Sequence, residues 1–442
     1  MARQCSLTSD DLFGSLFVPE RMRLAVSGRA WVEAMLTFEA VLASAEAEAG
    51  LIPAEAAEAI AAAAAAPDRF DVSELGEAGR AGGNPAAPLV RALTAAVEGD
   101  ARAYVHFGAT SQDVMDSACS IVSRAGVALI REQLDDACRY AARLIDAHRD
   151  TPMVARTLGQ QALPTTFGLR AAGWLDALLD AQDELAAVPF AAQLGGAAGT
   201  MASLGDAGPR VLGLVAAGLD LDEPVLPWHT ARGRVARLGG ALAVAAGTAE
   251  KIAGDVIALA RTEIGEVAEG GAGGGSSTMP HKRNPAGSAR AVACAHTARG
   301  HASVLLGTMA QDHERAAGPW QAEWQAVTGA LAATGGAVAA ARGVLRELEV
   351  HPERMRANLE LTGGLVMTEA VVTALVGAGA GRQEAHDMVA ALVGGGGDLR
   401  AGLVADGRLS EGDVDAALDP ANYLGASGQL IDRVVARYEA RG

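Results

Sequence analysis

The chain has 442 residues and a formal net charge of −17, and half of its residues are hydrophobic although only 4% are aromatic. A core built mainly from Ala, Leu and Val favours closely packed helices over a sandwich or barrel, because strands prefer β-branched and aromatic side chains. The acidic balance argues against a general nucleic-acid or anionic-membrane surface, since either requires a basic face. An anionic ligand would therefore need a locally cationic pocket.

Targeting and metal-binding signals are weak. The first ten residues are mostly polar and hold no apolar run of the kind that a signal peptide requires. The most apolar stretch, Leu238–Thr248, is well short of the roughly 20 residues that cross a bilayer. Four widely spaced cysteines form no metal-type cluster. We therefore expect a cytoplasmic protein with no metal, no cofactor and no membrane partner.

The N-terminal part of the chain is predicted to form short helices. The segment Ala30–Ala66 is rich in Ala and Glu, and a turn at Gly50–Pro53 divides it into two helices. Glycines and prolines then cluster in Gly79–Pro88. A polar loop, His106–Asp113, precedes the first long helix.

That long helix is predicted over Val114–Arg149, which contains no proline and a single glycine. Apolar residues recur in it at alternating spacings of four and three, as in a helix packed along a partner. These seam residues are Ile130, Leu134, Ala137, Ala141 and Leu144. Similar long segments are Leu163–Ala187, Val235–Ile264, Pro285–Ala310 and Gln321–Glu347. Five such helices would form a bundle about 40 to 50 Å long, with apolar flanks that copies of the chain would cover.

After Val350 the helical segments shorten, and turns fall at Gly394–Gly397 and Asp419–Pro420. We therefore predict an all-α protein with three helical domains. Residues 1–105 would form the N-terminal domain, residues 106–348 the central five-helix bundle that assembles into a tetrameric helical core, and residues 349–442 the C-terminal domain.

The segment with the strongest chemical signal is Glu269–Pro285, which reads EGGAGGGSSTMPHKRNP. Five glycines before Ser276 give a loop that can close over a ligand and bring backbone N–H groups near an oxyanion. An interdomain linker is the alternative, but linkers rarely end in several hydroxyls, a lysine and an asparagine. The segment lacks the Gly-Lys-Ser/Thr of a phosphate-binding loop, and no GxSxG elbow is present.

The stretch GSSTMPHKRNP, Gly275–Pro285, resembles the signature of the aspartase/fumarase superfamily. HFGATSQDVMD, His106–Asp116, and ARTLGQQALPTTFG, Ala155–Gly168, are similar to two further blocks of that superfamily. Within the superfamily, five further segments most resemble the family of bacterial 3-carboxy-cis,cis-muconate cycloisomerases. They are GGNPAAPLV, GGAAGTMASLGD, PWHTARGR, HERAAGPWQAEW and LDPANYLG. The resemblance implies a homotetramer in which three subunits contribute to each active site.

The resemblance also implies roles for individual residues toward a small anionic di- or tricarboxylate. Ser276 would be the general base or acid at the carbon α to a carboxylate, and Lys282 would stabilise the negative charge as a second catalytic residue. His106 would be an acid or an orienting group, with a purely structural hydrogen bond as the alternative. The implied substrate-binding residues are Asn84, Thr110, Ser111, Thr157, Gln161, Ser277, Met279, Asn284 and Arg315.

The sequence departs from the lyases of the superfamily at two linked positions. Those lyases commonly carry a His and a Glu that protonate a leaving group, but the matching residues here are Leu158 and Ala289. Their joint loss fits a cycloisomerase, in which the substrate's own carboxylate is the nucleophile. It also fits β-elimination from a substituted succinate whose leaving group needs no proton, such as nitrosuccinate. Adenylosuccinate lyase-type activity and a non-catalytic structural role are less favoured.

A second departure concerns positive charge. The cycloisomerase pattern usually reads Arg-Asp-Arg with a following Glu, but this chain has Arg232-Gly233-Arg234 and then Arg237. If these arginines face the site, they suit a tricarboxylate. The interpretation that we favour from sequence is a solvated surface.

Overall fold

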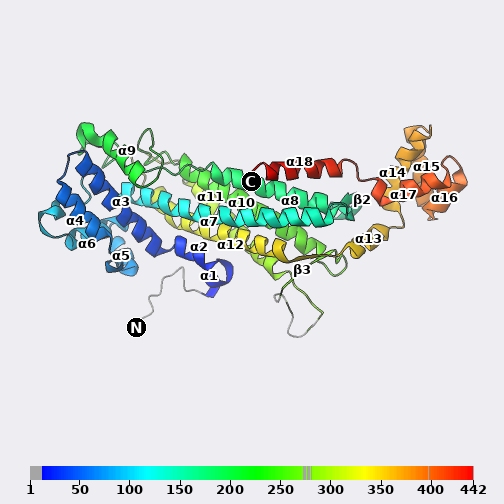
Figure 1. The fold of residues 1–442 in the computed structure, drawn as a ribbon, viewed down its shortest axis with the longest axis horizontal. Coiled ribbons are helices and arrows are strands. Elements are labelled where there is room, and N and C mark those ends of the chain that lie inside the picture. Colours follow the sequence, from blue (N-terminus) through cyan, green and yellow to red (C-terminus); the bar gives the residue numbers. More distant parts are fainter. Residues whose placement is uncertain (1–11, 272–274, 276–278, 280, 397, 442) are drawn as a thin grey trace. The chain divides into compact units, whose positions relative to one another are not determined.

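The structure is a computed structural model that describes residues 12–271, 275, 279, 281–396 and 398–441 (Figure 1). The chain folds into two compact units, each assembled from three stretches of sequence. The first unit comprises Met1–Leu134, Ala181–Glu250 and Arg290–Ala340, and the second comprises Asp135–Asp180, Lys251–Ala289 and Ala341–Gly442. Helices dominate both units, so the expected all-α class is confirmed. The three domains and their boundaries at residues 105 and 348 stay a prediction.

The N-terminal helices belong to the first unit. They are α1 (Leu12–Phe17), α2 (Glu20–Ala25), α3 (Gly28–Glu48), α4 (Ala54–Ala64), α5 (Val72–Gly79) and α6 (Ala86–Ala96). The hydroxyl of Ser27 accepts the Ala30 N–H at 3.1 Å and so caps α3. Gly50 adopts a φ of 77° in the turn before α4, as a helix C-terminus favours. Helices α3 and α4 pack against each other (Figure 1), which confirms the predicted pair.

The long helices follow. They are α7 (Ser111–His148), α8 (Phe167–Ala186), α10 (Gly233–Leu259), α11 (Ala286–Gly307) and α12 (Pro319–Glu347), with the shorter α9 (Gly208–Gly218) between α8 and α10. All five seam residues of α7 are buried, as predicted. A Cβ at Gly126 of α7 would lie 3.0 Å from Leu331 of α12, so glycine permits this close approach of the two helices.

Four short strands were not predicted. Strands β1 (Pro152–Thr157) and β2 (Gln160–Thr166) form an antiparallel hairpin, and β3 (Val267–Glu269) pairs antiparallel with β4 (Leu348–Val350). Helix α8 therefore begins at Phe167 rather than at Leu163. A bulge between Val154 and Arg156 accommodates the hairpin's irregular register.

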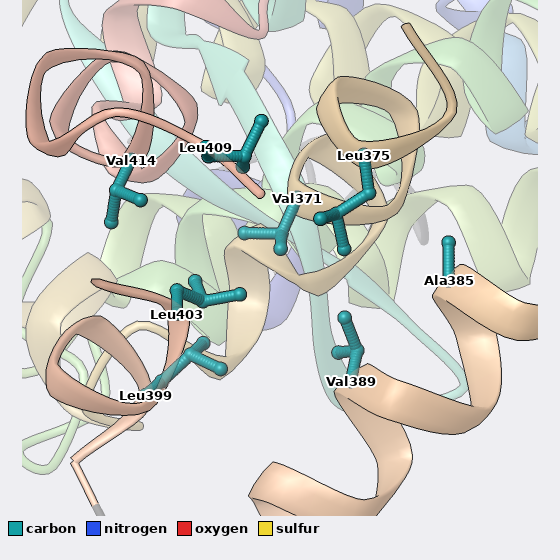
Figure 2. Close-up of a cluster of buried hydrophobic side chains, with 8 residues drawn as sticks. All are labelled: Val371, Leu375, Ala385, Val389, Leu399, Leu403, Leu409 and Val414. Atoms are coloured by element: carbon teal, nitrogen blue, oxygen red, sulfur yellow. The ribbon is translucent and has the colours of Figure 1, made fainter. Parts of the chain in front are cut away.

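The C-terminal helices belong to the second unit. They are α13 (Pro352–Glu360), α14 (Thr368–Gly377), α15 (Arg382–Gly394), α16 (Leu399–Asp406), α17 (Glu411–Leu418) and α18 (Ser427–Glu439). Side chains of α14 to α17 and of the segment before α17 converge on one apolar cluster (Figure 2). Asp398 and Ser410 cap α16 and α17 through their side-chain oxygens. This part of the chain therefore has a core of its own.

Among the described helices, none is by itself both long and apolar enough to cross a membrane. One bent pair, Pro352–Glu360 with Leu365–Gly377, satisfies the length and composition criteria together.

Candidate active site

Asp113 organises the first predicted block, in the first unit. Its carboxylate accepts the backbone N–H groups of Thr110 at 2.9 Å, Gly195 at 2.9 Å and Gly196 at 3.0 Å. The same carboxylate lies 2.7 Å from Nε2 of His229. Because Asp113 is fully buried, these contacts fix the loop before α7 against the loop at residues 195–196. Thr110 and Ser111 are thereby positioned at the start of α7.

His106 lies in the same loop and is held by a buried carboxylate. Its Nδ1 is 2.7 Å from Oε1 of Glu39 on α3, and its backbone φ of 60° is left-handed. Burial lowers the pKa of His106, but the negative charge of Glu39 and the hydrogen bond to it outweigh burial, so the net pKa is raised. This backbone region is uncommon for residues other than glycine.

Arg315 also reaches this part of the first unit. Its Nε donates to Oε1 of Gln112 at 3.1 Å, and a terminal nitrogen lies 3.4 Å from the Gly196 carbonyl oxygen. The structure therefore brings together His106, Thr110, Ser111 and Arg315 around the loops at 106–110 and 195–196. The side chain of Asn84 has a local role, because its Oδ1 accepts the N–H groups of Ala86 and Ala87 at the start of α6.

The second block forms the β1–β2 hairpin, in the second unit. Arg156 pairs with the buried carboxylate of Glu266 at 2.9 and 2.8 Å, and Asn358 of α13 donates to the same carboxylate at 2.7 Å. Gln161 donates to the Asn358 carbonyl oxygen at 3.1 Å. The hairpin is thereby anchored to α13, and Thr157 lies exposed at its tip.

The two residues of the hairpin turn are Leu158 and Gly159, with φ values of 52° and 80°. This is the backbone of a type I′ turn, which normally carries Asn-Gly or Asp-Gly. Leu158 is fully exposed, with a relative accessibility of 103%. An exposed leucine in a left-handed conformation does not stabilise a hairpin.

The third block, also in the second unit, is anchored at both ends. Glu269 accepts the N–H groups of Gly287 and Ser288 at 2.9 and 2.7 Å, at the start of α11. Arg283 forms two hydrogen bonds of 2.9 Å with Glu349 on β4. Within these anchors, the side chains of Met279, Lys282 and Asn284 are exposed. The predicted residues Ser276 and Ser277 lie outside the described residues.

The expectation of a solvated surface is wrong for Arg232. This side chain is 1% exposed and binds Asp116 at 2.7 and 3.0 Å and Glu323 at 2.5 Å. Its guanidinium carbon lies 4.7 Å from the Trp228 ring centre. Arg237 is exposed, as expected. Arg232 is therefore the centre of a buried charge network rather than a substrate ligand facing solvent.

Sequence reasoning missed four acidic residues that position the blocks: Glu39, Asp113, Glu266 and Glu269. Asp113 lay inside a recognised block and could have been singled out. The other three stand among many surface carboxylates in the sequence, and only their burial or their partners distinguish them. In the described part of the chain, no cluster of three or more metal-ligating side chains is found.

Comparisons with known proteins place the chain in a family. The family model described as Lyase matches residues 18–300, and that described as Adenylosuccinate lyase C-terminus matches residues 364–434. The chain is 44% identical to 3-carboxy-cis,cis-muconate cycloisomerase of Bradyrhizobium diazoefficiens, over 94% of this chain and 95% of the relative. It is 41% identical to nitrosuccinate lyase of Streptomyces davaonensis, over 93% and 91%.

Solved structures agree with the sequence comparison. The crystal structure of 3-carboxy-cis,cis-muconate lactonizing enzyme from Pseudomonas putida matches with a TM-score of 0.91 and 38% identity, over 97% of this chain and 99% of that chain. The helical fold and the family match define an enzyme of the lyase class. The chain belongs to the lyase family of the aspartase/fumarase superfamily. Within this family, its similarity to 3-carboxy-cis,cis-muconate cycloisomerases extends over nearly the whole chain.

Proposed function

We propose that the chain is a cycloisomerase that converts 3-carboxy-cis,cis-muconate to a carboxymuconolactone, in the protocatechuate branch of aromatic-acid breakdown. The observation that carries this proposal is the near full-length similarity to cycloisomerases in both sequence and structure. The absence of the usual His and Glu, replaced by Leu158 and Ala289, supports it. A carboxylate nucleophile needs no base to activate it, and no leaving group departs.

The chemistry follows from the substrate. One of its carboxylates attacks the β carbon of an unsaturated acid, so a C–O bond forms and the π electrons move toward the α carbon and its carboxylate. Ser276 then supplies a proton to the α carbon. The carboxylate carries extra negative charge between these steps, and Lys282 with loop N–H groups would stabilise it. Each charge-assisted donor contributes about 1.5 to 3 kcal/mol in a site kept from water.

The remaining site residues would hold the substrate acid groups. Hydroxyl and amide donors come from Thr110, Ser111, Thr157, Gln161 and Asn284, with Asn84, Ser277, Met279 and Arg315 as further contacts. Met279, Lys282 and Asn284 are exposed in the single chain. Their exposure supports a site completed by other copies of the chain. The enzyme that we propose is a cytoplasmic homotetramer that uses no cofactor.

A second candidate function is the elimination of nitrite from nitrosuccinate to give fumarate. The 41% identity to nitrosuccinate lyase favours it, and nitrite leaves without protonation. The two functions are separated by incubating the purified protein with each substrate. Loss of the diene absorbance of 3-carboxy-cis,cis-muconate supports the first, whereas nitrite release from nitrosuccinate without diene loss would replace it with the second.

The site itself is tested by Ser276→Ala, which should lower kcat by about 10²- to 10⁴-fold while the oligomer stays intact. Ser73→Ala on α5 serves as the control and should retain full activity. An active Ser276→Ala enzyme would remove the proton-transfer role of Ser276.

Sharing of sites between copies is tested by mixing two inactive chains, Ser276→Ala and Thr110→Ala. If each site takes these residues from different subunits, refolding the mixture restores part of the activity. A mixture as inactive as its components would contradict the shared site. Sedimentation should give four times the chain mass of 44.7 kDa.

A further inference from the structure

Glu39 and His106 form a buried pair on two different elements of the first unit. The Glu39 side chain comes from the middle of α3 and is inaccessible to solvent, whereas the His106 side chain, in the loop before α7, is 17% exposed. The contact joins Nδ1 of the imidazole to Oε1 of the carboxylate at 2.7 Å. This length is typical of a charge-assisted hydrogen bond.

The pair fixes which ring nitrogen is available to a ligand. Because a carboxylate only accepts hydrogen bonds, Nδ1 must carry its proton toward Glu39. Nε2 has no hydrogen-bond partner among the described residues. The hydrogen bond between Nδ1 and Glu39 holds the ring in place. The ring can therefore present only Nε2 to a ligand, in the same loop as Thr110.

The surrounding charges favour a protonated ring. Burial lowers the pKa of His106, but the charge of Glu39, the hydrogen bond to it and the charge of Asp113 raise the pKa by more, so the net pKa is raised. Glu46 lies seven residues further along α3 and is fully buried, and burial raises its pKa to about 8, with a further contribution from the charge of Glu39. Glu46 is therefore neutral at pH 7, so Glu39 is the charged carboxylate of α3 that interacts with the protonated imidazole.

We propose that Glu39 is a positioning residue that keeps His106 cationic, so that His106 donates Nε2–H to a substrate carboxylate rather than accepting a proton. This assignment rests on the proposed function for the identity of the substrate. It supplies a cation in addition to Lys282, in a chain whose net charge is −17. It also accounts for the retention of a histidine here although the His and Glu pair of the other lyases is missing, since a lactonisation needs charge stabilisation and no acid for a leaving group.

The kinetic test compares Glu39→Gln with the matched control Glu46→Gln, which alters another buried carboxyl on the same helix. In the wild type, kcat/KM should fall as pH rises through the His106 pKa, because the cation is lost. Glu39→Gln should move this fall to lower pH and decrease kcat/KM at pH 7.5 by about 10- to 100-fold, the equivalent of one charge-assisted donor. Glu46→Gln should leave the pH profile unchanged. A merely structural Glu39 would give the wild-type profile in Glu39→Gln, and that outcome would overturn the proposal.

A second readout does not depend on turnover. Diethyl pyrocarbonate acylates only neutral imidazole, and peptide mass spectrometry reports the rate at each histidine as a function of pH. His106 should reach half of its maximal rate at a higher pH than His386, which is 69% exposed and serves as the internal reference. In Glu39→Gln the His106 midpoint should move to lower pH. A wild-type midpoint at or below that of His386 would overturn the proposal even if the variant failed to fold. If the wild type did not act on carboxymuconate, the proposed substrate would be rejected, and the acylation experiment would still decide the assignment of Glu39.

Discussion

The buried Arg232 network allows a sharp prediction about stability. Arg232→Met removes the cation that binds Asp116 and Glu323, and all three side chains are at most 3% exposed. Two carboxyl groups then remain buried without their partner, at a cost of about 3 to 5 kcal/mol. At roughly 2 to 4 °C per kcal/mol, the melting temperature should decrease by about 6 to 20 °C.

The loss of stability in Arg232→Met should be larger at high pH than at low pH. Burial already raises the pKa of Glu323, and Arg232 opposes this effect. Without Arg232, the pKa of Glu323 in the folded protein rises further above its unfolded value. The contribution of Glu323 to stability is then present when its carboxyl group is protonated and is lost as pH rises through the folded pKa. The decrease in melting temperature of Arg232→Met relative to the wild type should therefore be smaller at pH 5 than at pH 8.

The assay is thermal unfolding by circular dichroism at one protein concentration, because oligomer assembly shifts apparent stability. Arg400→Met is the matched control, since Arg400 forms a similar two-bond pair with Asp415 but is 48% exposed. Its melting temperature should not change measurably. Equal shifts for the two variants, or a deficit of Arg232→Met that does not vary with pH, would refute the reasoning.

Three further predictions concern backbone and buried charge. Gly196→Ala should lose both stability and activity, because the φ of Gly196 is +67° and a Cβ would lie 2.9 Å from the Gly108 carbonyl oxygen. Gly199 also has a left-handed backbone but has open space around it, so Gly199→Ala should lose only stability, by about 1 to 2 kcal/mol. Melting curves and kcat/KM for the two variants test this difference. Leu158→Asn should relieve the backbone strain in the turn, and so raise the melting temperature, while it lowers kcat/KM. Unchanged kinetics would exclude a role of Leu158 at the site. Glu46→Gln should be more stable than the wild type at pH 8, because the raised folded pKa of Glu46 makes the wild type lose stability as pH rises. The difference in the free energy of unfolding between the two proteins should grow from about pH 5. A difference in urea unfolding that stays constant with pH would contradict this.

Much of the fold could be predicted because helices are specified locally. The scarcity of aromatic residues and the four-three spacing of α7 predicted long Ala-rich helices, and every seam residue is buried. Turn signals at Gly50 and around residues 394–397 marked helix ends that the structure contains. These patterns depend only on residues a few positions apart, which is the range over which a single sequence is informative.

The strands could not be predicted in the same way. Strand β3 pairs with β4 about eighty residues further along the chain, and each has only three residues. The β1–β2 hairpin turns at Leu158-Gly159 without an Asn or Asp, and Pro164 in β2 argues against a strand. Pairing energy from the partner strand overrides these weak local preferences.

For the candidate site, the chemical class could be predicted from the chain alone, because each of the three polar blocks that carry the family resemblance is continuous in the chain. Which charges are buried, and beside which partners, depends on how the helices pack. Arg232 looks like a surface residue in sequence, yet Asp116 and Glu323, each about 90 or more residues away, enclose it. Glu39 likewise acquires its relation to His106 from packing across 67 residues. A buried charge is stable only beside a partner, and partners distant in the chain meet only when the helices pack.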